Sequence, residues 1–490
     1  MPLQLIAAAY FEGLPSWFPD PYLLLKWATG LGTVALTKWY TSGRRNPAER
    51  NMHGRVVLMT GGTSGIGAET AYELARRGAQ LCLLTRQPPS DPFLVEYIDD
   101  LRAKTGNQLI YAEQVDLADL YSIRQFATRW IDNAPPRRLD MVVLCASTLT
   151  PPGGKRAVTA EGVEMTWMVN FLANFHLLGI LSPAIRAQPF DRDVRIVVPT
   201  CSSYIASPKL DLEDVMQGGN DKDWTPGRAY ARSKLAMMVF AKAYQKHLDA
   251  YKRPDTLPMN ARVVLVDPGY ARTAGMRRWL TRGALWGLLL YVVLYLFAWL
   301  LLKSPQMAAQ SVLYATMEGS LGRGPGGRLI KECMEVDCAR KDVDDEDVAK
   351  KLWESSDKLI ERVEKELAIK RAKAKKEQQK REEEAKQAAQ VEEIEALVGA
   401  IKKGKAKATK EPKEGQKKNG NKAKSTGNGA RQTQTQQLRN SSSCHPVFFT
   451  DKLRRPPLDV LSGLHSSPVA HGYVYRDAPR GSAKSAGPRL

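Results

Sequence analysis

A glycine-rich loop between an apolar segment and a helical segment constrains the fold of this chain more than any other feature. The loop runs Thr60-Gly61-Gly62-Thr63-Ser64-Gly65-Ile66-Gly67 and follows the apolar stretch Arg55–Thr60. Here Gly61 permits a tight turn, Gly65 lets the backbone approach a phosphate, and Gly67 lets the helix pack closely on the strand. Free N–H groups at the start of the helix favour a bound phosphate. The loop therefore predicts a nucleotide site, although glycine-rich loops also serve as plain turns.

Short apolar segments alternate with helical segments through most of the chain. The expected strands are Arg55–Thr60, Gln80–Leu84, Leu109–Glu113, Asp140–Leu144, Arg195–Val198 and Arg262–Val266, with a helix at Leu120–Trp130. Strands that are apolar throughout and separated by helices are typical of a parallel sheet covered on both faces. The sequence therefore predicts an α/β fold with a doubly wound parallel sheet, the Rossmann architecture.

The composition divides the 490 residues into three regions. We expect an apolar N-terminal region at 1–50, a packed domain at 51–340 and a charged C-terminal region at 341–490. Within the last region, Glu361–Gln390 is rich in Lys, Glu and Ala and predicts a solvated helix, with a coiled coil as the weaker alternative. From Gly404 onwards the chain has too few large apolar residues to offset its entropy, which predicts disorder.

The C-terminal region carries much of the formal net charge of +20, since 401–440 holds 12 basic residues and 2 acidic ones. A basic run of this kind attracts phosphate groups on lipid or on RNA, and the alternative is a solvated tail. We favour the solvated tail, expect no nucleic-acid partner, and keep an RNA or ribosome tether as the weaker hypothesis. The six cysteines show no CxxC spacing, so we expect no metal site, and the chain fits a reducing compartment.

An arginine follows the second expected strand, in Leu84-Thr85-Arg86. A site that prefers NAD usually has an acid at this place for the ribose hydroxyls, and this chain has none. The Arg86 guanidinium can pair with a 2′-phosphate. The sequence therefore favours NADP over NAD as the cofactor, unless Arg86 is only an exposed loop residue.

Two candidate catalytic side chains lie in Tyr230-Ala231-Arg232-Ser233-Lys234, at the start of a helical segment. Their spacing places Tyr230 and Lys234 on one face of the helix. A free tyrosine has a pKa near 10, and a nearby ammonium group is expected to lower this pKa and make the phenol a usable acid and base. The pattern occurs often by chance, so its weight depends on the motifs around it.

The order of the motifs supplies that weight. The glycine-rich loop is followed by Asp116 in VDLADL, Asn170 in MVNFLANFHLL, Ser203 in CSSYIA, then Tyr230 and Lys234, and finally Asp267-Pro268-Gly269-Tyr270-Ala271-Arg272-Thr273. Over about residues 53–335 the chain resembles the short-chain dehydrogenase/reductase family. The segments DLADLYSIRQFA, HLL after Asn170 and Lys303-Ser304-Pro305 resemble its retinol-dehydrogenase-like branch.

The resemblance implies a role for each matching residue. Tyr230 is expected to be the acid/base, Lys234 to lower its pKa and hold the nicotinamide ribose, and Ser203, rather than Ser202, to bind the substrate oxygen. Asn170 is expected to support a water that relays protons to Lys234. The implied cofactor-binding residues are Gly61, Thr63, Ser64, Gly65, Ile66, Gly67, Arg86, Asp116, Tyr230, Lys234, Pro268, Gly269 and Thr273.

The chain departs from the family pattern after the fourth expected strand. Where the family usually has Asn-Asn-Ala-Gly, this chain has Leu144-Cys145-Ala146-Ser147. Loss of the first asparagine removes a polar link between central strands, and Ser147 puts a side chain where the cofactor passes closely. This departure supports a second hypothesis, a catalytically weak nucleotide-binding membrane adaptor of the same fold. Pro199 lies at the end of the fifth expected strand, and the end of a strand tolerates a proline.

Two apolar segments predict contact with a membrane. Tyr22–Tyr40 has aromatic residues at both ends and only Lys26 and Lys38 as charges, which indicates an anchor whose flanking Arg44 and Arg45 leave the enzyme facing the cytosol. The alternative is an amphipathic helix packed on the domain. Gly283–Leu302 contains no charge and lies inside the catalytic domain, so a single crossing would separate the last strand from the sheet.

We therefore expect Gly283–Leu302 to be a monotopic element, either a re-entrant hairpin or an interfacial helix. Headgroup contacts are expected from Arg277, Arg278, Arg282 and Lys303. The alternative is a buried or oligomer-interface helix, so a homo-oligomer stays open. Together these features predict an NADP-dependent oxidoreductase that interconverts a carbonyl and an alcohol on an apolar substrate, such as a retinoid, steroid or fatty aldehyde. Its expected place is the surface of the endoplasmic reticulum or of a lipid droplet.

Overall fold

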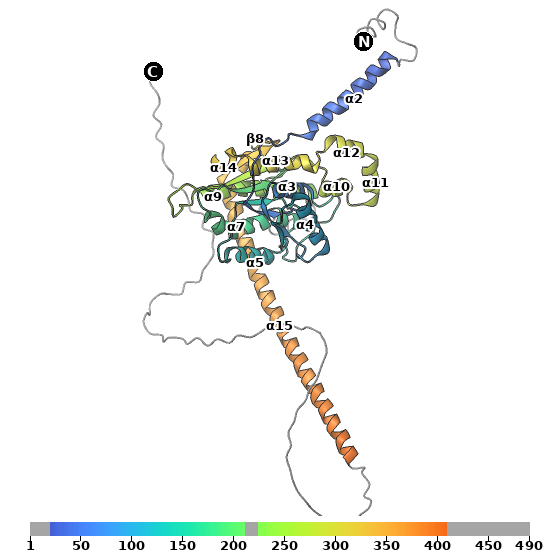
Figure 1. Cartoon of the computed structure of the whole chain (residues 1–490), viewed down its shortest axis with the longest axis vertical. Coiled ribbons are helices and arrows are strands. Elements are labelled where there is room, and N and C mark those ends of the chain that lie inside the picture. The colour runs from blue at the N-terminus through green and yellow to red at the C-terminus, as the bar shows by residue number, and fades with distance from the viewer. Residues whose placement is uncertain (1–19, 211–223, 409–490) are drawn as a thin grey trace, which may run out of the picture. The chain divides into compact units, whose positions relative to one another are not determined.

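One eight-stranded sheet organises the protein, whose computed structural model describes residues 20–210 and 224–408 (Figure 1). The strand order is β3-β2-β1-β4-β5-β6-β7-β8, with β1 to β7 parallel and β8 antiparallel to β7. The strands are β1 (Val56–Thr60), β2 (Gln80–Thr85), β3 (Ile110–Gln114), β4 (Met141–Leu144), β5 (Val194–Pro199), β6 (Ala261–Asp267), β7 (Arg328–Lys331) and β8 (Met334–Val336). The predicted parallel sheet is confirmed, with each expected strand within two residues of its observed bounds.

The central strands are apolar throughout because both of their faces are covered. In β1, Val56 and Leu58 pack into one hydrophobic cluster, whereas Val57 and Met59 pack into a second cluster on the other face. All five residues of β1 are buried. Side chains alternate between the two faces of a strand, so a strand with a helix layer on each side must be apolar at every position.

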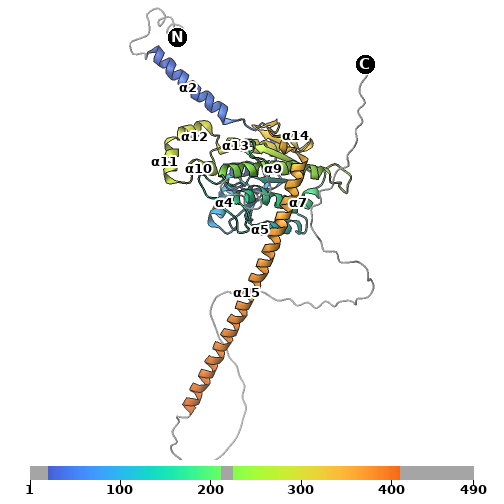
Figure 2. The same cartoon turned by 180° about the vertical axis from the view of Figure 1, so that it is seen from behind.

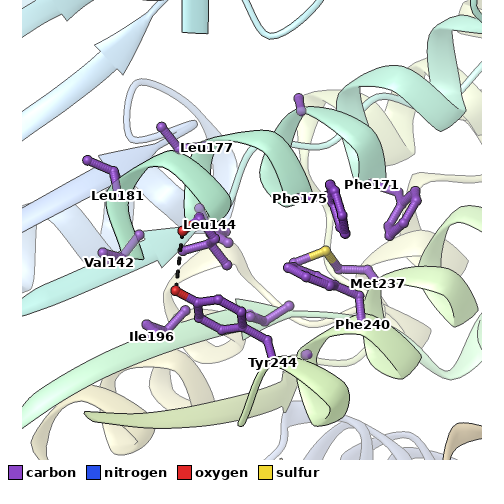
Figure 3. Close-up of a cluster of buried hydrophobic side chains, with 14 of the residues drawn as sticks. Val142, Leu144, Phe171, Phe175, Leu177, Leu181, Ile196, Met237, Phe240 and Tyr244 are labelled. Carbon is purple, nitrogen blue, oxygen red and sulfur yellow. Dashed lines mark hydrogen bonds between the residues drawn. The ribbon is translucent and has the colours of Figure 1, made fainter. Parts of the chain in front are cut away.

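Helices cover the sheet in two layers. One layer consists of α3 (Gly65–Arg76), α4 (Pro92–Thr105) and α13 (Pro305–Met317), and the other of α5 (Leu120–Ile131), α7 (Ala173–Arg186) and α9 (Pro226–Asp249). Figure 3 shows how aromatic side chains from the second layer fill the space above the sheet. There Tyr244 of α9 donates a hydrogen bond of 3.2 Å to the carbonyl of Leu178 in α7, which satisfies its hydroxyl inside the core.

The helix that carries Asn170 is interrupted by a wider turn. It begins as α6 (Met165–Trp167), passes through the π-helical turn η1 (Met168–Leu172) and continues as α7. Among the described helices, only the continuous stretch Met165–Arg186 is long and apolar enough to cross a bilayer, but 72% of its most apolar window is buried inside the protein. Its apolarity is therefore explained by its place in the core.

The long helix α15 (Glu346–Ala408) begins inside the catalytic domain. Trp353 lies against Phe175 and Phe240 with ring centroids 5.4 and 5.5 Å apart, and the buried side chains of Leu352, Leu359, Ile360 and Val363 join the same cluster. Figure 2 shows this part of α15 beside α9 and α7. The compact unit that holds the sheet therefore continues to Arg371 and does not end near residue 340, because these apolar side chains pack on it.

The remainder of the charged region lies beyond that unit. From Ala372 onwards α15 belongs to a second unit, and the solvated helix expected at Glu361–Gln390 falls within α15. The basic tail and the disorder expected in the C-terminal region fall almost entirely after Ala408, outside the described residues. The described residues also include four short helices: η2 (Ser202–Ala206), α10 (Ala274–Leu280), α14 (Ser320–Arg323) and η3 (Lys341–Val343).

Replacing Trp353 by alanine is expected to lower the free energy of unfolding by about 3–5 kcal/mol, because it empties an aromatic site in the core. Urea unfolding followed by circular dichroism measures the change. Trp286→Ala is the matched control: this side chain is 59% exposed, and its loss is expected to cost less than about 0.5 kcal/mol. Equal stability of the two variants would contradict the packing of α15 on the domain.

Two apolar segments project from the domain without entering its core. Helix α2 (Pro21–Ser42) covers the expected N-terminal anchor, and the expected inserted segment forms α11 (Leu285–Val293) and α12 (Tyr295–Leu301). The ends of the insert meet: the Arg272 N–H donates to the Lys303 carbonyl at 2.9 Å, and the Lys303 N–H donates to the Tyr270 carbonyl at 3.0 Å. The chain thus leaves the domain and returns to the same place.

Candidate functional site

The candidate residues gather at the carboxyl edge of the parallel sheet. The glycine-rich loop follows β1, and Arg86, Asp116, Ser147, Ser203 and Pro268 lie on the loops after β2, β3, β4, β5 and β6, respectively. The strand order reverses between β1 and β4, and ligands of such sheets bind in the crevice at that point. The topology alone therefore brings together residues far apart in the sequence.

The glycines of the loop allow contacts that no side chain would permit. Gly61 has a φ of +66°, and a Cβ there would lie 2.7 Å from the backbone of Ala146, at the end of β4. A Cβ on Gly67 would lie 2.0 Å from the carbonyl oxygen of Gly61. The loop is thus folded tightly against the neighbouring strand, which leaves the start of α3 open to a ligand.

The start of α3 and the loop after β6 border the same space. Helix α3 begins at Gly65, and its N-cap residue Ser64 makes no side-chain capping bond. Gly65 has a φ of +58°, and a Cβ there would lie 3.2 Å from Cγ2 of Thr273. Thr63 and Ile66 are half-buried on either side of this turn. The first N–H groups of a helix have no partner within the helix, and small residues around them leave room for a phosphate.

Arg86 and Asp116 lie at the far end of this edge. Arg86 is exposed and its guanidinium makes no ion pair with any residue in the described ranges, so it is free to pair with an added anion. The Asp116 carboxylate accepts a hydrogen bond of 2.8 Å from the Ala118 N–H and thereby shapes its own loop.

Tyr230 and Lys234 lie one turn apart on α9, as their spacing predicts. The Lys234 amine lies 5.5 Å from the centre of the Tyr230 ring and donates to the Pro199 carbonyl at 3.3 Å. Pro199 pairs with Val266 of β6 and lies beyond the pairing of β5 with β4, so its missing N–H costs no ladder bond there. Burial lowers the pKa of the Lys234 ammonium, and the nearby thiols oppose that shift.

The pKa of Tyr230 differs from the expectation. Burial raises this pKa well above its ordinary value, the Cys201 thiol raises it further, and a hydrogen bond from Ser147 lowers it. The Lys234 amine is itself buried and donates to the Pro199 carbonyl. In this arrangement the expected lowering by the ammonium is therefore outweighed by desolvation.

The two neighbouring serines point to different places. Ser203 Oγ lies 2.6 Å from the Cys201 sulfur, and this sulfur lies 3.8 Å from the Tyr230 hydroxyl. Ser202 instead donates to the Asp267 carboxylate and accepts a 3.1 Å hydrogen bond from Lys331. Ser203 is thus the serine on the Tyr230 side, as expected, and the two hydroxyls are joined through Cys201.

Asn170 lies in the π-helical turn η1, which turns its side chain towards the loop after β4. Its side-chain oxygen accepts from the Thr148 N–H at 2.7 Å, and its amide donates to the Thr148 carbonyl and to Ser233 Oγ, both at 3.0 Å. Ser233 in turn donates to the Tyr230 carbonyl at 2.8 Å. Turns of this kind are frequent at functional sites, and this one ties the loop to α9.

Other groups make up for the missing family motif after β4, where this chain has Cys145-Ala146-Ser147. Thr60 Oγ1 accepts a 3.2 Å hydrogen bond from the Ala146 N–H, which links the ends of β1 and β4. Ser147 Oγ lies 3.3 Å from the Asn170 side-chain oxygen and also bonds Tyr230. Ser147 therefore joins the two candidate catalytic residues.

The turn after β6 is fixed from several sides. Gly269 has a φ of +76°, its N–H donates to Asp267 at 3.0 Å, and a Cβ there would lie 2.8 Å from the Lys303 amine. That amine also donates to the Pro268 carbonyl at 3.4 Å. The turn thus joins the candidate site to the base of the apolar insert.

Sequence reasoning missed Cys201 and Tyr270 as neighbours of Tyr230, and it read Ser147 only as an obstacle. All three raise or lower the pKa of Tyr230, and each comes from a different loop. Their only sequence signal was adjacency to expected motif residues. Within the described parts of the chain, no group of three or more His, Cys, Asp or Glu side chains is placed to hold a metal ion.

Comparison with known proteins identifies the family. The family model described as short chain dehydrogenase matches residues 55–205. The Uncharacterized oxidoreductase pbr1 of Schizosaccharomyces pombe is 42% identical over 77% of this chain and 100% of its own. This chain belongs to the short-chain dehydrogenase/reductase family. It is therefore an oxidoreductase, and the family indicates that it acts on a carbonyl/alcohol pair.

Two further relatives show the branch of this short-chain dehydrogenase/reductase. Retinol dehydrogenase 13 of Mus musculus is 31% identical over 68% of this chain and 91% of its own. Polyprenol dehydrogenase of Mus musculus is 33% identical over 63% of this chain and 84% of its own. The predicted likeness to the retinol-dehydrogenase-like branch is confirmed.

Proposed function

We propose that this short-chain dehydrogenase/reductase uses NADP(H) to interconvert a carbonyl and an alcohol on an apolar substrate at a membrane surface. The observation that carries the proposal is the assembly of Tyr230, Lys234, Ser203 and Asn170 beside the glycine-rich loop. Retinoid, steroid and lipid-like carbonyls or alcohols are the substrate classes that we consider. The names of the retinol and polyprenol dehydrogenases support an apolar molecule of this kind.

The chain offers a fitting site for a dinucleotide. Gly61, Gly65 and Gly67 keep the start of α3 clear for the diphosphate, and Arg86 is free for a 2′-phosphate. Asp116 would contact the adenine, and Pro268, Gly269 and Thr273 would lie beside the nicotinamide and phosphates. When bound, the nicotinamide supplies or accepts the hydride.

The remaining chemistry belongs to side chains of the chain. In reduction Tyr230 donates its hydroxyl proton to the substrate oxygen as that oxygen gains charge, and in oxidation the phenolate takes the proton back. Ser203 Oγ hydrogen-bonds the same oxygen and holds it near the phenol. Lys234 would bind the ribose of the cofactor, and its ammonium, 5.5 Å from the centre of the Tyr230 ring, would stabilise the phenolate. Asn170 ties the loop after β4 to helix α9.

The apolar insert supports the choice of substrate and place. It leaves the domain at Arg272, three residues after Gly269, and its exposed leucines and aromatics continue away from the site. We infer that an apolar substrate enters the site from the side on which this segment lies. We propose the cytosolic surface of the endoplasmic reticulum or of a lipid droplet as the place of action, with the basic residues beside the insert at the headgroups.

A steady-state assay tests the proposal as a whole. The purified full chain in detergent is given NADPH or NADH with a panel of retinoid, steroid and fatty aldehydes or ketones, and cofactor oxidation is followed by absorbance. We expect turnover that prefers NADPH and an apolar carbonyl. Measurable NADPH binding without turnover on any substrate would instead favour the catalytically weak adaptor, which the Cys145-Ala146-Ser147 departure suggests.

Replacing Arg86 by alanine is expected to weaken NADPH use by at least about tenfold in kcat/KM, because a charge-assisted hydrogen bond to the 2′-phosphate contributes about 1.5–3 kcal/mol. The kcat/KM for NADH, which has no 2′-phosphate, is the internal control and is expected to change less than about threefold. Equal losses with both cofactors would show that Arg86 serves the loop and not the phosphate.

Replacing Ser147 by glycine is expected to move the rising limb of alcohol oxidation to higher pH. The hydrogen bond from Ser147 lowers the pKa of Tyr230, so its removal raises that pKa. Oxidation requires the phenolate, which then forms only at higher pH, whereas reduction requires the phenol and is retained. The pH dependence of kcat/KM in both directions measures the shift. A limb that stays in place or moves to lower pH would remove Ser147 from the site.

A further inference from the structure

Apolar side chains cover two helical elements that lie far apart in the sequence. On α2, Leu25, Leu31 and Leu36 are 61–66% exposed, and on α11 Leu289 and Val293 are 69% and 71% exposed. The other large apolar residues exposed on these elements are Tyr22, Leu23, Leu24, Trp27, Val34, Trp39, Tyr40, Leu285, Trp286, Leu288, Leu290, Val292, Leu294, Tyr295, Leu296, Phe297 and Leu301. So many exposed large apolar side chains on two neighbouring elements are rare in proteins that only face water.

Side chains near the end of α2 bind the end of α12. The Lys38 amine donates to the Trp299 carbonyl at 2.6 Å, and Thr41 Oγ1 donates to the Leu300 carbonyl at 2.6 Å. The last carbonyls of a helix have no partner within the helix, so these two side chains cap α12 from another part of the chain. The Lys38 amine also lies 4.9 Å from the centre of the Trp299 ring. We call these contacts the α2–α12 clamp.

A second set of contacts fixes the clamp to the domain. Glu332, in the turn between β7 and β8, accepts a 3.1 Å hydrogen bond from the Arg44 N–H and pairs with the Lys303 amine. Gly287, near the start of α11, lies so close to the C-cap residue of α10 that a Cβ there would lie 2.1 Å from the Thr281 carbonyl oxygen. The end of α2, the return of the insert and the sheet edge are therefore held together by named contacts. Figure 1 shows α2 and α12 on the same side of the domain.

Basic residues are the only charged residues inside the two segments that hold these elements, and the acidic Asp20, Glu49 and Glu332 lie at their borders. Residues 21–48 contain 4 basic residues and no acidic residue, and residues 268–317 contain 5 basic residues and no acidic residue. Arg44, Arg45, Arg277, Arg278 and Arg282 are exposed. Exposed leucines and aromatics beside basic residues match the acyl chains and anionic headgroups of a lipid leaflet.

We propose that α2 and the α11–α12 hairpin form one composite surface that binds a bilayer leaflet containing anionic phospholipid, with the α2–α12 clamp holding the two elements together. The proposal rests on the proposed function at the membrane and names the surface and the lipid. Two linked elements bind as a unit because insertion of one raises the effective concentration of the other. The chain enters this surface from the loop after β6, which belongs to the candidate site, so binding to the leaflet would bring the site close to the membrane.

Flotation of the purified full chain with vesicles tests the surface. Phosphatidylcholine vesicles with and without phosphatidylserine are compared, and the affinity is expected to fall at least about tenfold without the anionic lipid. Leu31→Asp on α2 and Leu289→Asp on α11 are each expected to weaken binding at least about tenfold. Phe93→Asp on α4 is the matched control, since Phe93 is 82% exposed but lies off the surface, and its binding is expected to be unchanged.

A pair of double variants tests the clamp. Lys38→Met with Thr41→Val removes the contacts to α12, whereas Lys26→Met with Thr33→Val removes the same groups from α2 without touching α12. The first variant is expected to bind vesicles at least about fivefold more weakly than the second. Equal binding of the two would overturn the clamp, and equal binding of Leu289→Asp and Phe93→Asp would overturn the composite surface.

Failure of the composite surface can be distinguished from failure of the proposed oxidoreductase function. Each variant is also assayed with a short, water-soluble aldehyde in detergent, where leaflet binding plays no part. We expect unchanged turnover there for the surface and clamp variants. Self-association of the wild-type chain by light scattering, without flotation, would contradict the proposal by showing that a second copy covers the apolar surface.

Discussion

Replacing Tyr230 by phenylalanine is expected to lower kcat about 10²–10⁴-fold in both directions, because it removes the only hydroxyl that the proposed mechanism uses as acid and base. NADPH affinity is expected to change less than about threefold, since the ring remains and the glycine-rich loop is untouched. Steady-state kinetics with an apolar aldehyde, together with fluorescence titration of NADPH, measure both quantities.

The matched control for this variant is Tyr251→Phe. Tyr251 lies two residues after Asp249, the last residue of α9, and so at the opposite end of this helix from Tyr230. The guanidinium carbon of Arg186 lies 4.6 Å from the centre of the Tyr251 ring. Its kcat is expected to stay within about twofold of the wild type. If Tyr230→Phe also kept wild-type turnover, the proton would have to come from another group and the proposed mechanism would fail.

Replacing Gly67 by alanine is expected to raise the Kd for NADPH at least about thirtyfold, or about 2 kcal/mol, because overpacking forces the loop to move. The added Cβ would lie 2.0 Å from the Gly61 carbonyl oxygen, a backbone atom that cannot step aside as a flexible side chain can. The displaced loop then no longer presents the start of α3 to the diphosphate. Fluorescence titration gives the Kd, and thermal unfolding shows how much of the loss is stability.

Gly227→Ala provides the comparison for this substitution. Gly227 lies in the first turn of α9, and a Cβ there meets nothing within 4 Å. Its Kd for NADPH is expected to match the wild type within about twofold, with a small gain in helix stability. Similar Kd values for the two glycine variants would mean that the glycine-rich loop does not hold the cofactor.

Features set by local pattern were predictable from the sequence. The strands β1 to β6 are apolar runs between turn residues, and the parallel sheet follows from their alternation with helices. The position of α15 was missed because the composition of this region is dominated by charge. Trp353, Ile360 and Val363 nevertheless recur at helical spacing, a signal of one buried face at the start of an otherwise charged helix.

The candidate site was predictable only in part. Tyr230, Lys234 and Ser203 were predicted from the order and spacing of the motifs. The sheet topology brings these motifs to one edge of the sheet. Cys201 and Ser147 touch Tyr230 through contacts between three loops, and no spacing along the chain encodes such contacts. The sequence predicted a lowered pKa for Tyr230 because it shows the charge partner Lys234. Burial, which raises this pKa, is given only by the fold.

The measurement that tests the central claim most directly is transfer of deuterium from NADPH deuterated at C4 to an apolar aldehyde. The full chain in detergent is mixed with both, and the alcohol is analysed by mass spectrometry beside the Tyr230→Phe variant. We predict deuterium at the carbinol carbon with the wild type and none above background with the variant. Bound NADPH that never passes deuterium to any member of the carbonyl panel would contradict the account and leave the nucleotide-binding adaptor in its place.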